Sequence, residues 1–387
     1  MDKIRVLFPF MESGYGHIMP LRSIEQTFRK KYGDRVEVVS SQFYTESGDP
    51  HLIRFEKMMG RQVKMYNTIP ALGHFATAAD AFFGARLSTL GAMRLSAPYA
   101  HGHGIAHMAE LKPDVVVSTH WASNYYAQKQ KKNKPFTIMY CPDAQLNNLF
   151  EYPCDLLLMS MPYGYEKALR KKQYNIQNCK MVPFWIRNEA FEVDTDKAAL
   201  RKKLGIPENN FTILLAEGGY GIGKMAKITE QLVSLHLPLT VMPICGTNQK
   251  LFEHFKTLKC APEVTFRPYA FADHIFDLEA ASDIFCGKSG NMIAELTFFG
   301  CPSIVTHCAN HIEENIADHY INTVGCAVKE TNVKKIIQTI LSCAEDRTKL
   351  EPYRKAALDY HDHFGSDKGA DVIWEAICQR FPKLAQH

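Results

Sequence analysis

One local pattern occurs in both halves of this chain: an apolar run, then a glycine-rich turn, then a helix. In the first half Ile4–Phe10 leads into a turn that ends with Gly16 and His17, and in the second half Phe211–Ala216 leads into Gly218-Gly219. An apolar run of this length followed by a helix is typical of a βα unit in a parallel sheet. The expected fold class is therefore α/β, with two Rossmann-like domains facing each other across a cleft.

The length of 387 residues agrees with two domains of ordinary size. A charged segment from Arg187 to Asn210 separates the two patterns and indicates a linker. We therefore predict a first domain over 1–186 and a second over 187–387, and leave open whether the last helix packs back on the first domain. The alternation of strands and helices is interrupted over 44–104, which indicates an insertion, with contact to a membrane as one interpretation.

Composition and charge narrow the classes of function. The 11 cysteines form no CxxC pair, which argues against a disulfide framework and indicates a reducing compartment. No signal peptide or apolar run of about 18 residues is evident, so we expect a soluble or peripheral protein. Residues 1–187 carry 24 Lys and Arg against 15 Asp and Glu, whereas residues 188–387 carry 21 against 26. Without a nucleic-acid motif, the basic half favours an anionic membrane or an acidic substrate, and a solvated basic face is the alternative.

The insertion combines cations with apolar side chains, as an interfacial helix requires. An ordinary helical core is the alternative interpretation. His103 and His107 have helical spacing, but no third metal ligand is evident, so no metal site is predicted. The cations are Arg54, Lys57, Arg61, Lys64, Arg86 and Arg94, and the apolar residues are Met58, Met59, Phe75, Phe82 and Phe83.

Two residues of the first half stand where an acid or base is expected. His17 follows the first strand, at the carboxyl edge where ligands of open α/β sheets bind, and an imidazole there can take a proton from a hydroxyl. Capping the helix is its other possible role. Asp143 follows the strand Phe136–Tyr140 and either orients a base, binds acceptor hydroxyls or caps a turn.

The second half holds a candidate anion site after the strand 283–286. Lys288 lies in a turn that precedes the predicted helix Asn291–Phe299, and backbone N–H groups at a helix start attract phosphate. Glu295 falls in the first turns of that helix, where a carboxylate can accept from ribose hydroxyls. An ordinary strand–turn–helix with a surface glutamate is the alternative.

The order and spacing of short motifs resemble those of GT-B glycosyltransferases in the family of monogalactosyldiacylglycerol synthases and processive diacylglycerol glucosyltransferases. The likeness spans most of the chain. The motifs are Gly14-x-Gly16-His17, Pro113-Asp114, Ser118-Thr119-His120, Pro142-Asp143, Arg187, Leu204-Gly205, Gly218-Gly219, Ile244-Cys245-Gly246-x-Asn248, Phe271-Ala272-Asp273, Ala281-Ser282-Asp283, Lys288-Ser289-Gly290, Ile293-Ala294-Glu295, Gly300-x-Pro302 and Glu314-Asn315.

The resemblance implies an inverting transfer of a hexose from a UDP-sugar to a hydroxyl, with His17 as base and Asp143 assisting. It places Tyr15 and His120 near the acceptor and implies no bound metal or other cofactor. The loop from Lys288 to Glu295 is one residue shorter than usual in the family and lacks its Thr, and Tyr15 replaces a glycine. The implied donor site comprises Gly16, Arg187, Gly218, Gly219, Gly246, Asn248, Phe271, Ala272, Lys288, Ser289, Gly290, Glu295, Glu313, Glu314 and Asn315.

The expected acceptor is a diacylglycerol-type lipid, met at the cytoplasmic face of a membrane by a peripheral enzyme. Three alternatives stay open: a transferase for a soluble natural product or saccharide, a UDP-sugar 2-epimerase, and a non-catalytic nucleotide-sugar binding subunit. No nucleic-acid partner is expected.

Overall fold

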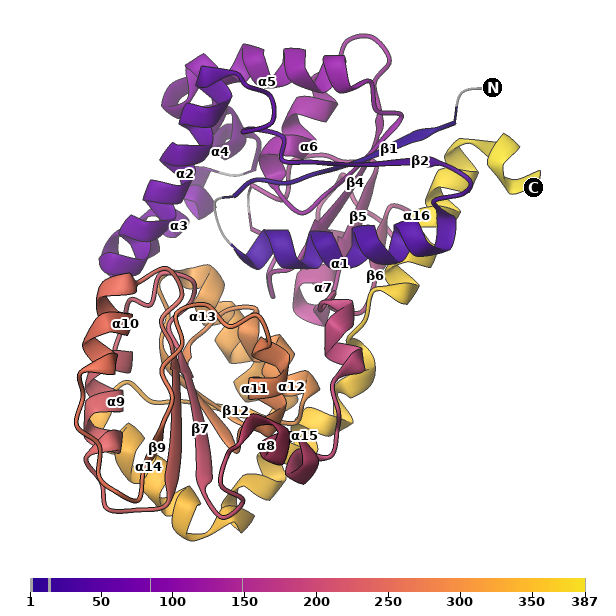
Figure 1. The fold of residues 1–387 in the computed structure, drawn as a ribbon. Helices are drawn as coiled ribbons and strands as arrows, with labels where there is room; N and C mark the ends of the chain where they lie inside the picture. The colour runs from indigo at the N-terminus through magenta and orange to yellow at the C-terminus, as the bar shows by residue number, and fades with distance from the viewer. Residues whose placement is uncertain (1–2, 13–14, 84, 148, 387) are drawn as a thin grey trace. The chain divides into compact units, whose positions relative to one another are not determined.

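The computed structural model describes residues 3–12, 15–83, 85–147 and 149–386. The chain forms two compact units, coloured in chain order in Figure 1. The first comprises Met1–Met65, Leu72–Asn188 and His363–His387, and the second comprises Tyr66–Ala71 and Glu189–Asp362. The main division thus falls two residues after the predicted one, and the C-terminal segment belongs with the first unit.

The first unit contains a six-stranded parallel sheet in the order β2-β1-β3-β4-β5-β6. The central strands are mostly apolar, and nearly all of their residues are buried, because helices cover both faces of the sheet. The strands are β1 (Arg5–Pro9), β2 (Glu37–Ser41), β3 (Val115–Ser118), β4 (Phe136–Cys141), β5 (Leu156–Met159) and β6 (Cys179–Met181).

Helices on the two faces of this sheet bury alternate side chains of each strand. Val6 packs in the cluster under α1 and α16, whereas Leu7 packs in the cluster under α2, α5, α6 and α7. The Tyr32 ring of α1 stacks on Trp374 of α16 at 4.6 Å, which fixes the C-terminal helix to this unit. The helices are α1 (Tyr15–Tyr32), α2 (Pro50–Thr68), α3 (Pro70–Phe83), α4 (Ala85–Gly91), the π-helix η1 (Ala92–Ser96), α5 (Pro98–Leu111), α6 (Trp121–Gln128), α7 (Pro162–Leu169), α16 (Asp367–Arg380) and the 3₁₀-helix η6 (Pro382–Gln386).

The predicted insertion is helical and consists of α2 to α5. Met58 and Met59 are partly buried and pack against the hydrophobic core, which for these two residues agrees with the alternative of an ordinary helical core. Phe75 and Phe82 are 73% and 86% exposed on α3, as an interfacial face requires. The side chain of Phe83 lies outside the described part of the chain.

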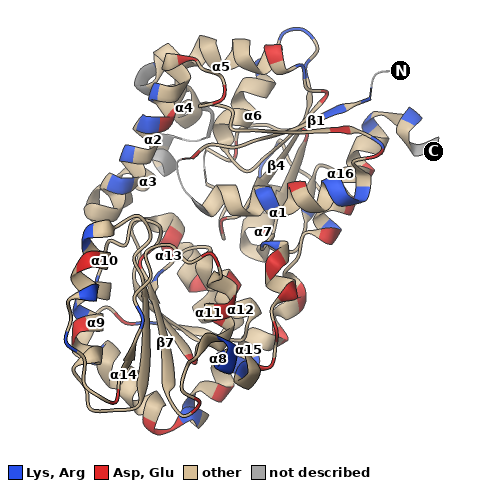
Figure 2. Ribbon diagram, viewed as in Figure 1, with Lys and Arg blue, Asp and Glu red and all other residues tan. Residues whose placement is uncertain are grey.

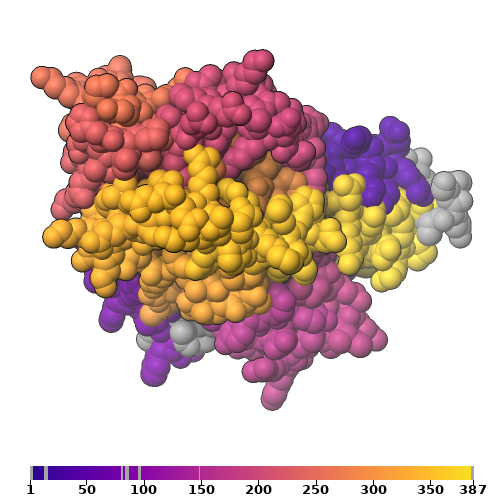
Figure 3. All heavy atoms as spheres, turned by 90° about the horizontal axis from the view of Figure 1, so that it is seen from below, coloured from indigo at the N-terminus to yellow at the C-terminus, as the bar shows by residue number. Residues whose placement is uncertain are grey.

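The second unit repeats the architecture with a parallel sheet in the order β12-β11-β10-β7-β8-β9. Helices α9, α10 and α14 pack in the hydrophobic cluster on one face, and α8, α11 and α12 pack in the cluster on the other. Figure 3 shows residues 333–362, in orange to yellow, over one side of this unit. The strands are β7 (Phe211–Ala216), β8 (Leu239–Ile244), β9 (Thr265–Phe266), β10 (Ile284–Lys288), β11 (Ser303–His307) and β12 (Ala327–Lys329).

The predicted α/β class with two Rossmann-like domains is confirmed. Lys288 is the last residue of β10 and not part of a turn, because its backbone still pairs with β11. No helix among the described residues is long and apolar enough to span a membrane. The remaining helices are the 3₁₀-helix η2 (Asn188–Glu192), α8 (Lys197–Leu204), α9 (Met225–Val233), α10 (Gln249–Lys256), α11 (Ile275–Ala281), α12 (Met292–Phe298), α13 (His311–Asp318), the π-helix η3 (His319–Val324), α14 (Val333–Glu345), and η4 (Arg347–Leu350), α15 (Glu351–Asp359) and η5 (His361–His363).

Candidate functional site

In the first unit the candidate base lies at the point where the strand order reverses. The chain runs from β1 to β2 on one side and then returns to β3 on the other, and ligands of such sheets bind outside the carboxyl ends at this position. His17 follows β1, while Thr119 and His120 follow β3. Thr119 Oγ1 donates to the His17 carbonyl at 2.7 Å, which joins the two loops.

The two histidines, His17 and His120, form an uncharged aromatic pair at this edge. Their ring centroids are 5.8 Å apart and nearly perpendicular, and the His17 ring also stacks on Phe150 at 5.7 Å. Burial lowers the pKa of His17 to about 4. Burial, with a smaller effect of His17, lowers the pKa of His120 to about 3. Both imidazoles are therefore neutral near pH 7, and a neutral imidazole can accept a proton.

His17 and His120 differ in what their ring nitrogens contact. His120 Nδ1 accepts from the backbone N–H of Ala122 at 3.3 Å and thereby caps α6. His17 Nδ1 is buried and makes no hydrogen bond with the residues that the structure describes. His17 Nδ1 thus keeps hydrogen-bonding capacity at this edge that the described residues do not use.

The other predicted residues of this edge are placed as follows. Asp143 is buried in the loop after β4, and Asn147 Nδ2 donates to its Oδ2 at 2.8 Å. This bond ties Asp143 to its own loop, and its role as a partner of His17 stays a prediction. Gly16 lies in the first turn of α1, while the Tyr15 side chain lies outside the described residues.

In the second unit the strand order reverses between β7 and β10, and polar residues gather there. Glu217 directly follows β7, Lys288 ends β10, and His307 ends the neighbouring β11. Because carboxyl ends of parallel strands meet at one edge, residues up to 90 positions apart come together. A cation, a carboxylate and an imidazole thus replace the neutral pair found in the first unit.

Lys288 is held by two oxygen acceptors at this edge. Its Nζ donates to Glu313 Oε1 and to Asn67 Oδ1, each at 2.6 Å. Ser289 Oγ donates to the Glu313 carbonyl at 2.7 Å. The predicted residues Lys288, Ser289 and Glu313 are therefore brought together. An ammonium has three N–H donors, so the third can donate to a phosphate oxygen.

Glycines let two loops of this edge approach closely. Gly218 has a φ of +66°, and a Cβ there would lie 3.3 Å from Lys288 Cε. A Cβ on Gly246 would lie 2.4 Å from the Gly219 carbonyl oxygen, which makes glycine necessary at 246. Gly290 has open space around the position of a Cβ. Asn248 Oδ1 accepts from Leu251 N at 3.1 Å and caps α10.

The remaining predicted donor residues keep their roles as predictions. Phe271 is 58% exposed, whereas its neighbour Ala272 is buried. Glu295 is partly buried in the first turn of α12. Glu314 lies 2.8 Å from His311 Nδ1. Arg187 and Asn315 are likewise partly buried.

Sequence reasoning missed the pair Glu217 and His307. Glu217 Oε2 lies 3.0 Å from His307 Nδ1, and Oε1 accepts from Lys224 N and Thr306 Oγ1. His307 Nε2 is buried and makes no hydrogen bond within the described chain. The position of Glu217 directly before Gly218 was a visible signal, but nothing local points to His307, which the sheet topology supplies.

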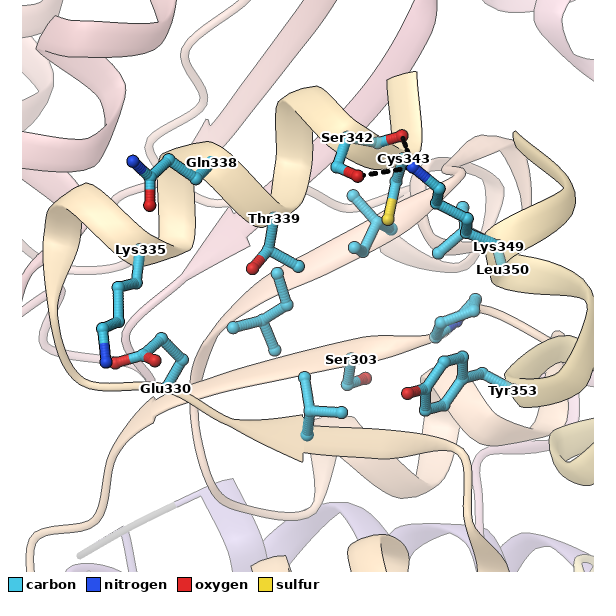
Figure 4. A pocket seen from close by; sticks show the side chains of 14 residues that line it. Ser303, Glu330, Lys335, Gln338, Thr339, Ser342, Cys343, Lys349, Leu350 and Tyr353 are labelled. Carbon is cyan, nitrogen blue, oxygen red and sulfur yellow. Dashed lines mark hydrogen bonds between the residues drawn. The ribbon is translucent and has the colours of Figure 1, made fainter. Parts of the chain in front are cut away.

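A cavity of about 560 Å³ in the second unit lies away from this edge. Its lining includes Ile284 and Ser303, the first residues of β10 and β11, together with α14. Figure 4 shows Lys349 beside α14, where its Nζ donates to the Ser342 carbonyl and hydroxyl oxygens. Ligands of open α/β sheets bind at the carboxyl ends instead, so this cavity is not the candidate site.

Two Rossmann-like units with a site at each strand-order reversal define a fold of the GT-B type. No family model matches the chain. It is 24% identical over 363 residues to a probable monogalactosyldiacylglycerol synthase from Nicotiana tabacum, over 87% of this chain and 64% of the relative. The chain thus spans less than two thirds of that relative's length. The predicted resemblance to these synthases is confirmed.

Two solved structures share the fold at low sequence identity. The first is Anabaena HepE in complex with UDP and glucose, with a TM-score of 0.55, 17% identity and coverage of 97% of this chain and 100% of that one. The second is the UDP-GlcNAc 2-epimerase from Neisseria meningitidis bound to UDP-GlcNAc, with a TM-score of 0.60, 12% identity and coverage of 97% and 100%. Both comparisons show that the chain shares this fold.

Proposed function

We propose that the protein transfers a hexose from a UDP-sugar to a hydroxyl acceptor with inversion, and that the acceptor is a diacylglycerol-type lipid. The observation that carries the proposal is the contrast between the two strand-order reversals. One presents a neutral imidazole, and the other presents a cation beside glycine loops. The similarity to a monogalactosyldiacylglycerol synthase supports the same assignment.

The proposed reaction is a single displacement. His17 takes the proton of the acceptor hydroxyl while the oxygen attacks the anomeric carbon, and the bond from that carbon to the diphosphate breaks. Negative charge then develops on the leaving UDP, where Lys288 and backbone N–H groups stabilise it. We propose that this step needs no metal ion.

The helical insertion supports a lipid acceptor. Arg54, Lys57, Arg61 and Lys64 are all exposed on α2, with the spacing of one helix face. Figure 2 shows positions of Lys or Arg along α2 in blue. Phe75 and Phe82, seven residues apart, are exposed on the same face of α3. Cations combined with exposed aromatic rings are typical of elements that bind an anionic membrane surface. We propose a peripheral location on the cytoplasmic face.

Sedimentation with liposomes tests the membrane surface. Arg61→Gln/Lys64→Gln should weaken binding to anionic liposomes by about 25-fold, because each cation near such a surface contributes about 1 kcal/mol. Lys131→Gln/Lys132→Gln, which removes two exposed cations elsewhere in the first unit, should change little. Phe75→Ser should also weaken binding, with exposed Ile176→Ser as its control. Equal binding to neutral and anionic liposomes would contradict the proposal.

A panel of radiolabelled UDP-sugars, incubated with a total lipid extract, tests the reaction itself. Label entering the organic phase is the expected result. Label in a water-soluble glycoside would instead assign a soluble acceptor. A change of the UDP-sugar without any acceptor would assign the 2-epimerase, the second candidate that the Neisseria structure favours.

A further inference from the structure

The two ends of the helical insertion meet at three side chains that can bind a metal ion. Asp49 directly precedes α2, His51 lies in the first turn of α2, and His103 lies on α5. One ligand atom from each residue lies within 4.8 Å of the other two. All three belong to the first unit. Spacing along the chain could not reveal this group, because 54 positions separate Asp49 from His103.

Asp49 uses its two carboxylate oxygens in different directions. Oδ1 accepts from the backbone N–H of His51 at 2.7 Å and caps the start of α2, whereas Oδ2 lies 2.6 Å from His103 Nδ1. The His51 and His103 ring centroids are 4.2 Å apart. One oxygen thus fixes the carboxylate while the other faces an imidazole beside a second imidazole.

We propose that Asp49, His51 and His103 bind a divalent transition-metal ion, with Zn²⁺ as the preferred ion. Two histidines and one carboxylate are a ligand set that zinc uses, with water completing the tetrahedron. Ligand atoms at about 2.1 Å from zinc lie about 3.4 Å apart in a tetrahedron. The contact between Asp49 and His103 therefore opens by less than about 1 Å, and the metal replaces the proton shared there.

The surroundings set the expected strength of binding. A cavity of about 380 Å³ beside the group is lined by His107 and Glu110 in addition to Asp49 and His103, and it leaves room for water ligands. The Arg54 guanidinium lies 4.7 Å over the Tyr99 ring, whose centroid is 6.3 Å from that of His51. This nearby positive charge opposes a cation, so we expect moderate affinity.

A metal ion bound here links the two ends of the helical insertion between β2 and β3. The exposed Phe75 and Phe82 lie within this insertion. The role of the metal ion is structural, and it is independent of the transfer reaction. Bound Zn²⁺ should slow hydrogen exchange at the start of α2 and in α5, since a ligand that binds only the closed arrangement stabilises it.

Titration calorimetry with Zn²⁺ on the full-length, tag-free protein tests the site. His103→Ala and Asp49→Asn should each weaken the assigned site at least about tenfold. Asp49→Asn is the sharper variant, because asparagine still caps α2 while the charge is lost. His236→Ala is the matched control: His236 also faces a carboxylate, Glu263, at 3.0 Å but belongs to no metal-binding group among the described residues.

The expected result is one Zn²⁺ site that the wild type and His236→Ala share, with proton release on binding and no comparable binding of Mg²⁺. Co²⁺ in the same site should give the strong visible absorption of tetrahedral coordination. Wild-type affinity and stoichiometry in Asp49→Asn and in His103→Ala would overturn the proposal. Absorption bands of Co²⁺ that are unchanged in both variants would overturn it equally.

Discussion

The strand-order reversals of the two sheets share a backbone plan and differ in chemistry. In the first unit His17 and His120 pack against each other and against Phe150, and burial keeps both imidazoles neutral. In the second unit Glu217, Lys288 and Glu313 bring charge to the equivalent edge. Parallel-sheet topology therefore fixes where a ligand binds, while the residues just after the strands decide whether the edge handles a proton or an anion.

The largest effect on the contrast between the two units is expected when the proton acceptor of the first unit, His17, is removed. His17→Ala should lower turnover by about 10² to 10⁴, the usual contribution of a positioned general base, while UDP affinity persists. Initial rates with the preferred UDP-sugar, combined with calorimetry of UDP binding, measure the two effects. His254→Ala, at an exposed histidine paired with Glu230, is the control. Full turnover in His17→Ala would move the base elsewhere.

The same buried histidines should make the first unit sensitive to acid. In the unfolded chain a histidine titrates near its ordinary pKa of 6.5, whereas folded His17 titrates at about 4. Between these values the unfolded state binds more protons, so stability is present above pH 6.5 and is lost as the pH falls toward 4. At pH 4.5 the free energy of unfolding should therefore be about 2 to 3 kcal/mol lower than at pH 7 because of His17.

Urea unfolding at pH 7.0 and pH 4.5 measures this loss. Tryptophan fluorescence reports on the first unit alone, because all three tryptophans, Trp121, Trp185 and Trp374, belong to it. His17→Gln should reduce the difference in stability between the two pH values. An identical difference in wild type and variant would mean that His17 titrates normally in the folded protein.

In the second unit, binding of the UDP anion depends on Lys288. Lys288→Ala should weaken UDP binding by about 10- to 100-fold, since a charge-assisted hydrogen bond contributes about 1.5 to 3 kcal/mol. Glu313→Gln should not weaken it, because that change releases the ammonium from its carboxylate partner. Lys203→Ala, at an exposed lysine paired with Asp277, is the control in calorimetry. Equal UDP affinity in Lys288→Ala would remove the cation from the donor site.

Much of the fold, but less of the site, was predictable from the sequence. The buried strand β7 has the predicted bounds Phe211–Ala216, since an apolar run between turns marks it unambiguously. The short edge strand β12 was missed. Short edge strands depend on tertiary pairing more than on their own composition.

The part of the site that the sequence does not predict depends on contacts between side chains far apart in the chain. Lys288 reaches Asn67 across 221 positions, and Glu217 reaches Thr306 across 89. Local spacing carries no information on such contacts, because strand order brings them together. The sequence therefore located Lys288 and Glu313 as separate candidates, and the structure shows that they share one hydrogen bond.

The finest test concerns how the second unit recognises the nucleoside. Glu295→Ala should weaken UDP binding by about tenfold, if its carboxylate accepts from the ribose hydroxyls. The matched ligand is 2′-deoxy-UDP: the wild type should bind it less tightly than UDP, and Glu295→Ala should bind both alike. Calorimetry on the four combinations isolates the contact between Glu295 and the 2′-hydroxyl. If Glu295→Ala still distinguishes UDP from 2′-deoxy-UDP as the wild type does, another group binds the ribose. The anion site of the second unit then works without a carboxylate on α12.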